Sequence, residues 1–262
     1  MNFVDIHSHL ADPRFDSEQD SCRSELVQEA LQAGITFLVQ GGLGPEDWLR
    51  QEALAKKFPT IIPVFGLHPY WVKEHSDDEC EQALNQLAKA QLRIPAVGEM
   101  GLDLRKEYKD CESRQIEVFE RQLELASFAN KPVVLHIVRA HEESLRILQF
   151  WGLPKAGGFV HSFNGSIKKA NDFILLGLKI SVGGSLCHEH SKVLQEAVAH
   201  ISLENLLLES DSPDQAPASL TGRLNRPICI LEVAAKIAEL KGLKPREVLD
   251  RTSQNARKLL AL

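Results

Sequence analysis

The segment Val4-Asp5-Ile6-His7-Ser8-His9-Leu10 lies close to the N-terminus and begins with the apolar alternation of a β-strand. Residues i and i+2 of a strand point to the same face, so His7 and His9 project to one side. Two imidazoles aimed at one point suit a metal ion, although a His-x-His pair is equally typical of an ordinary polar strand end. The number of later strands that end in a metal-binding side chain decides between these interpretations.

Short apolar runs recur along the chain and alternate with longer amphipathic segments. Several of the runs are almost continuously aliphatic, as expected of strands buried on both faces of a parallel sheet. The predicted strands are 4–9, 36–41, 61–67, 96–99, 133–137, 158–162, 179–183 and 206–209. The predicted helices are 21–32, 45–57, 77–90, 113–129, 144–150, 166–176, 191–199, 226–240 and 245–260.

Alternating strands and helices without a linker or a break in composition indicate one α/β domain over residues 1–262. Eight such strands predict a single (β/α)8 TIM barrel, and 262 residues are enough to build one. Periodicity alone does not show that the sheet closes, so a doubly wound open sheet is the alternative.

Composition limits the location and the partners of the protein. No run of about 18 apolar residues is present, which argues against a membrane-spanning helix. The five cysteines are scattered and form no CxxC pair, and no signal peptide is evident, so we expect a cytoplasmic protein. A formal net charge of −6 argues against broad coating of nucleic acid, but it permits a local site centred on bound cations. A monomer is the default expectation.

Metal-competent side chains follow most of the predicted strands. In a TIM barrel the functional residues collect at the carboxyl ends of the strands. Each of these residues alone has an ordinary explanation, but their joint occurrence by chance is improbable. They supply four imidazoles and two carboxylates, enough for two divalent ions that share a bridging carboxylate: His7, His9, Glu99, His136, His161 and Asp211. His68, after the third strand, is more typical of a substrate-facing residue.

Seven short motifs occur in an order that resembles the TatD family of metal-dependent hydrolases, from about residue 3 to residue 260. The resemblance implies a TIM barrel of the amidohydrolase type and a metal-dependent phosphodiesterase that acts on DNA, in the manner of the TatD deoxyribonucleases. The motifs are His7-Ser8-His9, Gly66-Leu67-His68-Pro69, Gly98-Glu99-Met100-Gly101-Leu102-Asp103, His136, His161-Ser162-Phe163-Asn164-Gly165, Glu209-Ser210-Asp211-Ser212-Pro213 and Asn225-Arg226-Pro227.

The resemblance also implies roles for these residues. One ion would be held by His7, His9 and Asp211, and the other by His136 and His161, with Glu99 bridging. Asp211 would orient and deprotonate the attacking water, and His68 would lie near the substrate phosphate. Glu209 would support the ligands, and Asn225 would belong to a loop that closes over the site and would contact the substrate. The ligand set suits Zn, Mn, Ni or Co, and Mg less well.

The chain departs from the family pattern after the fifth strand, where the family usually has Arg two residues beyond His136. Here Val138 occupies that position and Arg139 follows it. A shift of one residue reverses the direction of a strand side chain, so a phosphate contact by Arg139 requires a loop that restores its direction.

Two alternative functions remain open from the sequence. The same ions could cleave an amide, ester or lactone in a small molecule, or the barrel could be a non-catalytic scaffold. Clustering of cationic residues at the barrel mouth would favour a nucleic acid substrate, and the candidates are Arg14, Lys73, Arg105, Lys106, Arg139, Arg223 and Arg226. The segment Gly41-Gly42-Leu43-Gly44 lacks the Lys-Ser/Thr of a P-loop and is interpreted as a turn.

Overall fold

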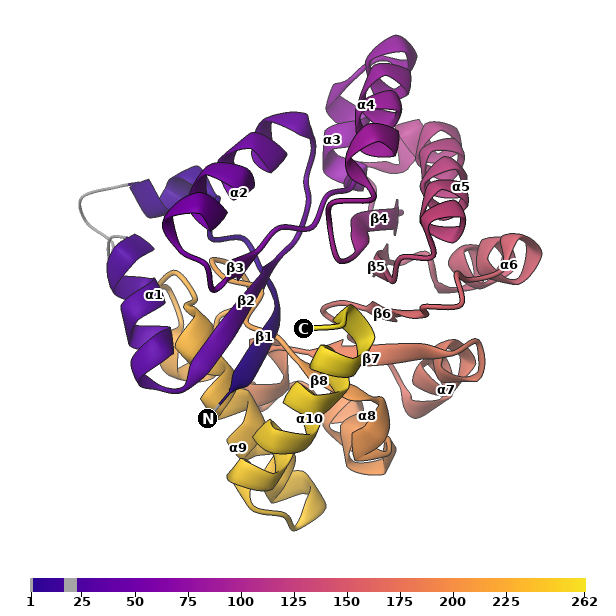
Figure 1. Ribbon diagram of the computed structural model, residues 1–262. Helices are drawn as coiled ribbons and strands as arrows, with labels where there is room; N and C mark the ends of the chain where they lie inside the picture. The colour runs from indigo at the N-terminus through magenta and orange to yellow at the C-terminus, as the bar shows by residue number, and fades with distance from the viewer. Residues whose placement is uncertain (1, 17–22) are drawn as a thin grey trace.

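A ring of parallel strands surrounded by helices forms the structure, a computed structural model that describes residues 2–16 and 23–262. Figure 1 shows the strands at the centre and the helices around them. Within the described residues the strands are β1 (Phe3–Ser8), β2 (Ile35–Gln40), β3 (Ile61–Ile62), β4 (Val97–Asp103), β5 (Val133–Val138), β6 (Gly158–Val160), β7 (Leu178–Val182) and β8 (Leu206–Leu208).

Main-chain contacts join the strands into a closed ring. The strands pair in the orders β1-β2-β3 and β4-β5-β6-β7-β8, all parallel. At one seam Phe65, shortly after β3, forms a parallel bridge with Val97 of β4. At the other seam the Asp211 N–H donates to the His7 carbonyl at 2.9 Å, and β1 contacts β8. The predicted (β/α)8 barrel is therefore confirmed.

The helices pack outside the ring, and local sequence signals set several of their ends. Ser76 and Glu79 form a reciprocal capping box at the start of α4, and Asn130 adopts a left-handed conformation that ends α5. The helices are α1 (Arg23–Gln32), α2 (Pro45–Lys57), α3 (Pro69–Glu74), α4 (Asp77–Ala90), α5 (Glu112–Ala129), α6 (His141–Trp151), α7 (Ile167–Leu175), α8 (Lys192–His200), α9 (Ile230–Lys241) and α10 (Pro245–Leu260). No helix among these described residues has the length and apolar composition needed to cross a membrane.

The predicted boundaries differ from the observed ones where backbone chemistry intervenes. The predicted strand 61–67 is reduced to two residues because Pro63 has no N–H to donate to a neighbouring strand. The fourth strand was predicted to end at Glu99 but continues to Asp103. The short helix α3 was not predicted, and helix 226–240 starts at Ile230 after a 3-10 turn. The predicted start of the first helix, Ser21, lies outside the described residues.

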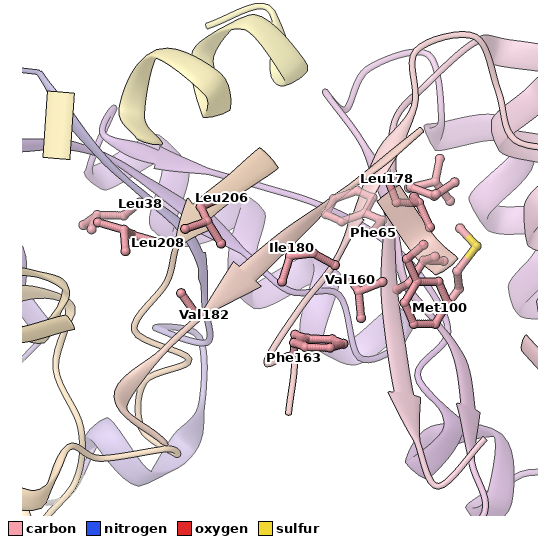
Figure 2. Close-up of a cluster of buried hydrophobic side chains, with 14 of the residues drawn as sticks. Leu38, Phe65, Met100, Val160, Phe163, Leu178, Ile180, Val182, Leu206 and Leu208 are labelled. Atoms are coloured by element: carbon pink, nitrogen blue, oxygen red, sulfur yellow. The ribbon is translucent and has the colours of Figure 1, made fainter. Parts of the chain in front are cut away.

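Apolar side chains fill two layers. Figure 2 shows part of the layer between the ring and its helices, including Leu38, Ile180 and Leu208. A second cluster occupies the inside of the ring, where side chains from the strands meet Ala256 and Leu260 of α10. In Figure 1 α10 ends near the centre of the ring. Helix α10 therefore covers the end of the barrel opposite to the carboxyl ends of the strands, which leaves the polar residues at those carboxyl ends to form the site.

Candidate metal centre

The predicted site residues converge at the carboxyl end of the barrel. They come from six different strands or from the turns that follow those strands. At most 11% of any of these side chains is exposed. A cavity of about 600 Å³ opens above them. The residues brought together are His7, His9, His68, Glu99, His136, His161 and Asp211.

Glu99 lies at the middle of this group, and its two carboxylate oxygens face different partners. Its Oε1 is 3.3 Å from Nε2 of His7 and 3.2 Å from Nε2 of His9. Its Oε2 is 2.8 Å from Nε2 of His161 and 3.5 Å from Nδ1 of His136. Burial alone would raise the pKa of Glu99, but the surrounding imidazoles, His161 foremost, outweigh burial and hold this pKa well below its usual range.

Asp211 completes the first set of ligand atoms. Its Oδ1 lies 3.7 Å from Nε2 of His7 and 3.4 Å from Nε2 of His9. Four atoms held about 2.0–2.1 Å from a tetrahedral zinc ion lie about 3.3–3.4 Å apart, so the observed spacings suit a first-row divalent ion. The backbone of Asp211 has a left-handed φ of 54°, which directs its carboxylate back over β1.

The second set depends on the orientation of His136. Its Nε2 lies 3.3 Å from Oδ2 of the wholly buried Asp103, so we place the ring proton on Nε2. The unprotonated Nδ1 then faces inward, 3.0 Å from Nε2 of His161 and near Glu99. A carboxylate that fixes the outer nitrogen of an imidazole is the usual support for a histidine that binds metal through its other nitrogen.

Unsatisfied polar atoms show that these residues fit a bound cation. Nε2 of His7 and both carboxylate oxygens of Glu99 are buried and make no hydrogen bond with the described residues. Buried polar atoms without partners are costly and rare, and a divalent ion satisfies lone pairs of this kind. The imidazole and carboxylate donors suit Zn, Mn, Ni or Co better than Mg.

His68 has a different hydrogen-bond arrangement from the other histidines. Its Nδ1 accepts a hydrogen bond from the Tyr70 N–H at 3.0 Å, so the neutral ring carries its proton on Nε2. Burial, followed by the charge of His136, holds the pKa of His68 well below its usual range, which keeps the ring neutral. Nε2 lies 3.1 Å from the unprotonated Nδ1 of His136, to which its N–H donates, and 3.6 Å from Oε2 of Glu99 at the cavity wall. His68 therefore presents an N–H donor rather than a lone pair at this wall.

Glu209, expected to support the ligands, lies behind them and is wholly buried. It accepts hydrogen bonds from the Ser162 N–H at 2.5 Å and from the Ser181 hydroxyl at 2.6 Å. Its Oε1 is 4.0 Å from Nδ1 of His161. This carboxyl group therefore faces the outer nitrogen of His161. Burial raises the pKa of Glu209 to about 8.

Arg139 reaches the cavity although it is displaced from the family position. Strand β5 ends at Val138, and Arg139 then adopts a left-handed φ of 53°, so the alternation of the strand no longer applies. Its side chain lines the cavity, is exposed, and makes no hydrogen bond or ion pair within the described chain. The loop thus restores the direction that the one-residue shift would have reversed.

Asn225 is placed differently from the expectation. It is wholly buried and does not line the cavity. Its amide donates to the carbonyl of Ser210 at 2.5 Å and to that of Asp214 at 2.9 Å, on either side of Asp211. The expected substrate contact does not match this position, because no atom of Asn225 is accessible from the cavity.

Of the seven cationic candidates, Arg14, Arg105 and Arg139 line the cavity. Arg14 is paired with Asp12 and Asp214 on one side of the mouth. The cationic candidates therefore cluster only in part, around a small mouth rather than over a broad face.

Sequence reasoning missed three residues of the site. Asp103 stood in a quoted motif without a role, and Gly41 was interpreted as part of a turn. A Cβ on Gly41 would lie 2.6 Å from Cε1 of His9 and 2.7 Å from Oε1 of Glu99. Tyr70 also lines the cavity. The position of Gly41 directly after β2 was the available signal, since carboxyl ends of adjacent parallel strands meet at the site.

Comparisons with known proteins agree with this geometry. A family model described as TatD related DNase matches residues 4–261. The metal-dependent hydrolase YjjV of Escherichia coli, described as uncharacterized, is 34% identical over 96% of this chain and 93% of its own. The 3'-5' ssDNA/RNA exonuclease TatD of Erwinia billingiae is 31% identical over 98% of both chains.

Solved structures are similar over the whole barrel. The crystal structure of Escherichia coli YjjV superposes with a TM-score of 0.90 at 32% identity, covering 99% of this chain and 98% of that one. A hydrolase of the TatD family from Entamoeba histolytica has a TM-score of 0.84 at 19% identity, over 99% and 98% of the two chains, and shows the same fold. From the matching family model and from relatives above 30% identity over nearly the full length, the chain belongs to the TatD family of metal-dependent hydrolases.

Proposed function

We propose that this chain is a deoxyribonuclease that hydrolyses phosphodiester bonds at the end of a DNA strand with two divalent ions. The main observation behind this proposal is the position of the Glu99 carboxylate. One of its oxygens faces His7 and His9, and the other faces His136 and His161. A carboxylate shared in this way is typical of sites with two metal ions. The relative named as an ssDNA/RNA exonuclease supports a nucleic acid substrate.

Under this proposal His7, His9 and Asp211 would hold one ion, His136 and His161 would hold the other, and Glu99 would be shared between them. When bound, the ions would lower the pKa of water and neutralise the charge that develops on the phosphoryl oxygens. Asp103 acts on the second set indirectly, because its bond to Nε2 of His136 keeps Nδ1 directed inward.

Three side chains of the chain act on the substrate itself. Asp211 orients the attacking water and accepts its proton, since its carboxylate faces both the ligand set and the cavity. His68 donates a hydrogen bond from its Nε2–H to a phosphoryl oxygen. This bond stabilises the charge formed in the transition state. Arg139, whose guanidinium at the mouth has no partner among the described residues, binds a neighbouring phosphate.

Charge and cavity size favour a strand end over the middle of a duplex. The chain carries a net charge of −6, so attraction for phosphates is confined to the mouth, where Arg105 and Arg139 lie. A cavity of about 600 Å³ has the size of an ordinary small-ligand site. Asn225 supports the site by holding the turn around Asp211. A cytoplasmic location and a monomeric state stay predictions.

The test is incubation of the purified protein with single-stranded and double-stranded oligonucleotides in the presence of Mn, Mg or Zn. We expect shortened products from the wild type, and a loss of orders of magnitude in turnover for Asp211→Asn and Glu99→Gln. Asp78→Asn, at an exposed position on α4, is the matched control and should behave as wild type.

Near-wild-type turnover of either site variant, with metal supplied, would contradict the assigned roles. Absence of cleavage on every oligonucleotide, with metal still bound, would refute the nuclease proposal and leave a hydrolase of small amides, esters or lactones.

A further inference from the structure

A group of aromatic and cationic side chains leads outward from the metal centre. The ring of Tyr70 lies 4.1 Å from that of His68, edge to face. On its outer side Tyr70 stacks on Tyr108, with ring centroids 4.6 Å apart and planes inclined by 16°. Both tyrosines are partly exposed, and Tyr70 lines the cavity. The stack therefore begins at the metal centre and ends at the surface.

Arg105 fixes this stack from one side. Its guanidinium is paired with the carboxylate of Asp103 at 2.6 Å and also donates to the Tyr70 hydroxyl. The guanidinium carbon lies 5.5 Å from the centroid of Tyr70 and 5.1 Å from that of Tyr108. About a third of the Arg105 side chain remains exposed, and it lines the cavity. We refer to Tyr70, Arg105 and Tyr108 as the tyrosine–arginine wall.

The charges at the wall are balanced, and Arg139 adds a further cation beside it. Asp103 at 2.6 Å and Glu107 at 3.7 Å offset the charge of Arg105, and Nζ of Lys73 lies 5.1 Å from the Tyr108 ring. Asp103 and Val138, the last residues of β4 and β5, pair in register, so Arg105 and Arg139 follow the ends of two adjacent strands. The wall and Arg139 therefore form one continuous side of the mouth.

The opposite side of the mouth has a different character. There Arg14 is bound by Asp12 and Asp214, two carboxylates for one guanidinium. The guanidinium of Arg14 is held in this ion-pair network, whereas that of Arg139, beside the wall, has no partner among the described residues. Arg139 therefore offers a phosphate a cationic partner on the side of the wall.

We propose that the tyrosine–arginine wall is the subsite for the nucleotide next to the cleaved bond, with the base against the tyrosines and a phosphate on Arg105. The inference rests on the proposed function and names its substrate more closely, as an unpaired nucleotide. Stacking on an aromatic side chain requires a base that has left its duplex, and it tolerates every base because each has an aromatic face. The wall thus selects single-stranded ends without reading sequence.

The test measures binding in an Asp211→Asn background, which removes turnover. An unlabelled decamer of thymidylate and a decamer of the same length and charge without bases compete, in Mn²⁺, against a labelled decamer. Stacking contributes roughly 5-fold to 100-fold in affinity per base, so the background protein should prefer the base-bearing decamer by about that factor. Tyr108→Ala should bring this preference close to unity.

Two further variants separate stacking from other causes. Tyr108→Phe keeps the aromatic face and should keep the preference, which excludes a general loss of folding as the cause. Arg105→Gln should weaken both decamers together and reduce the salt dependence by roughly one phosphate contact. Phe128→Ala removes an exposed aromatic ring at the C-terminal end of α5, outside the wall and the cavity lining, and is the matched control.

Each outcome distinguishes the two proposals. Equal weakening of both decamers by Tyr108→Ala, no weakening, or no binding of either decamer would overturn the role of the wall. Cleavage of DNA by the wild type together with any of these results would leave the nuclease function standing. A preference that depends on Tyr108, without cleavage of any nucleic acid by the wild type, would support the wall and refute the nuclease function.

Discussion

A single methyl group at Gly41 should disable one half of the metal centre without removing a ligand. A Cβ at this position would lie 2.6 Å from Cε1 of His9 and 2.7 Å from Oε1 of Glu99, and would also overlap Cε1 of His7. Ordinary contact begins at 3.4 Å, so the methyl group is about 0.7–0.8 Å too close to the atoms of His9 and Glu99 and closer still to that of His7. All three neighbours belong to the first ligand set, and none of the ligand atoms of the second set is among them.

The size of the effect follows from this overlap. Three ligands must shift by most of an ångström, and displacements of about 1 Å at a reacting centre cost roughly 100-fold in rate. Overpacking costs about 1–3 kcal/mol in the free energy of unfolding, and about 2–4 °C in Tm accompany each kcal/mol in a chain of this size. We therefore expect Gly41→Ala to lose about 100-fold in kcat/KM, while its Tm without metal falls by only several degrees.

Metal content gives the sharper measurement. Inductively coupled plasma mass spectrometry should find close to two equivalents of metal in the wild type and close to one in Gly41→Ala. Gly183→Ala is the matched control, because its backbone is extended and its Cβ would meet Glu209 at 3.4 Å, an ordinary contact. Two equivalents of metal and near-wild-type turnover in Gly41→Ala would refute the packing argument and the assignment of the first ligand set.

Three other predictions follow from the same structure. Removal of metal by a chelator should abolish turnover and lower Tm, and added Mn or Zn should restore both. The loss of stability should be about 4 kcal/mol relative to protein in metal at a thousand times its Kd. Calorimetry checks this, and an unchanged Tm would contradict it. Asp103→Asn should lower metal affinity or turnover by about 10-fold to 100-fold, because His136 loses the carboxylate on its Nε2. Retention of full affinity in a metal titration would argue against the orientation assigned to the His136 ring. Burial raises the pKa of Asp47 above its unfolded value of about 3.9, so the folded chain keeps a proton that the unfolded chain releases, and the contribution of Asp47 to stability falls as pH rises above about 4. Asp47→Asn lacks this loss, so its stability relative to wild type should increase as pH rises above about 4 in urea titrations, and a constant difference would contradict the sign.

The barrel was predictable from its aliphatic strands because burial on both faces leaves a strong pattern in β1, β5 and β8. The seven polar strand-end residues were also predictable, since parallel strands bring their carboxyl ends together. Strand β3 was overestimated because its hydrophobic pattern continues past Pro63, where pairing stops.

Other features of the site could not be predicted because they depend on tertiary packing. Nothing in the local sequence shows that Asp103 touches His136, or that Tyr70 stacks on Tyr108, since these partners are more than thirty residues apart. The direction of Arg139 depended on one left-handed φ, which a side chain of this type rarely adopts. The burial of Asn225 likewise became visible only once its carbonyl partners were located.

The sharing of Glu99 has a thermodynamic consequence for how the proposed ions bind. Each ion would use one oxygen of the same carboxylate, so filling one position would both order Glu99 and withdraw its charge from the other position. The ordering of Glu99 strengthens binding of the other ion, and the withdrawal of its charge weakens it. The two affinities are therefore linked by a coupling free energy, which linkage requires to be the same whichever ion binds first. A dissociation constant measured for one position describes the protein only at a stated occupancy of the other.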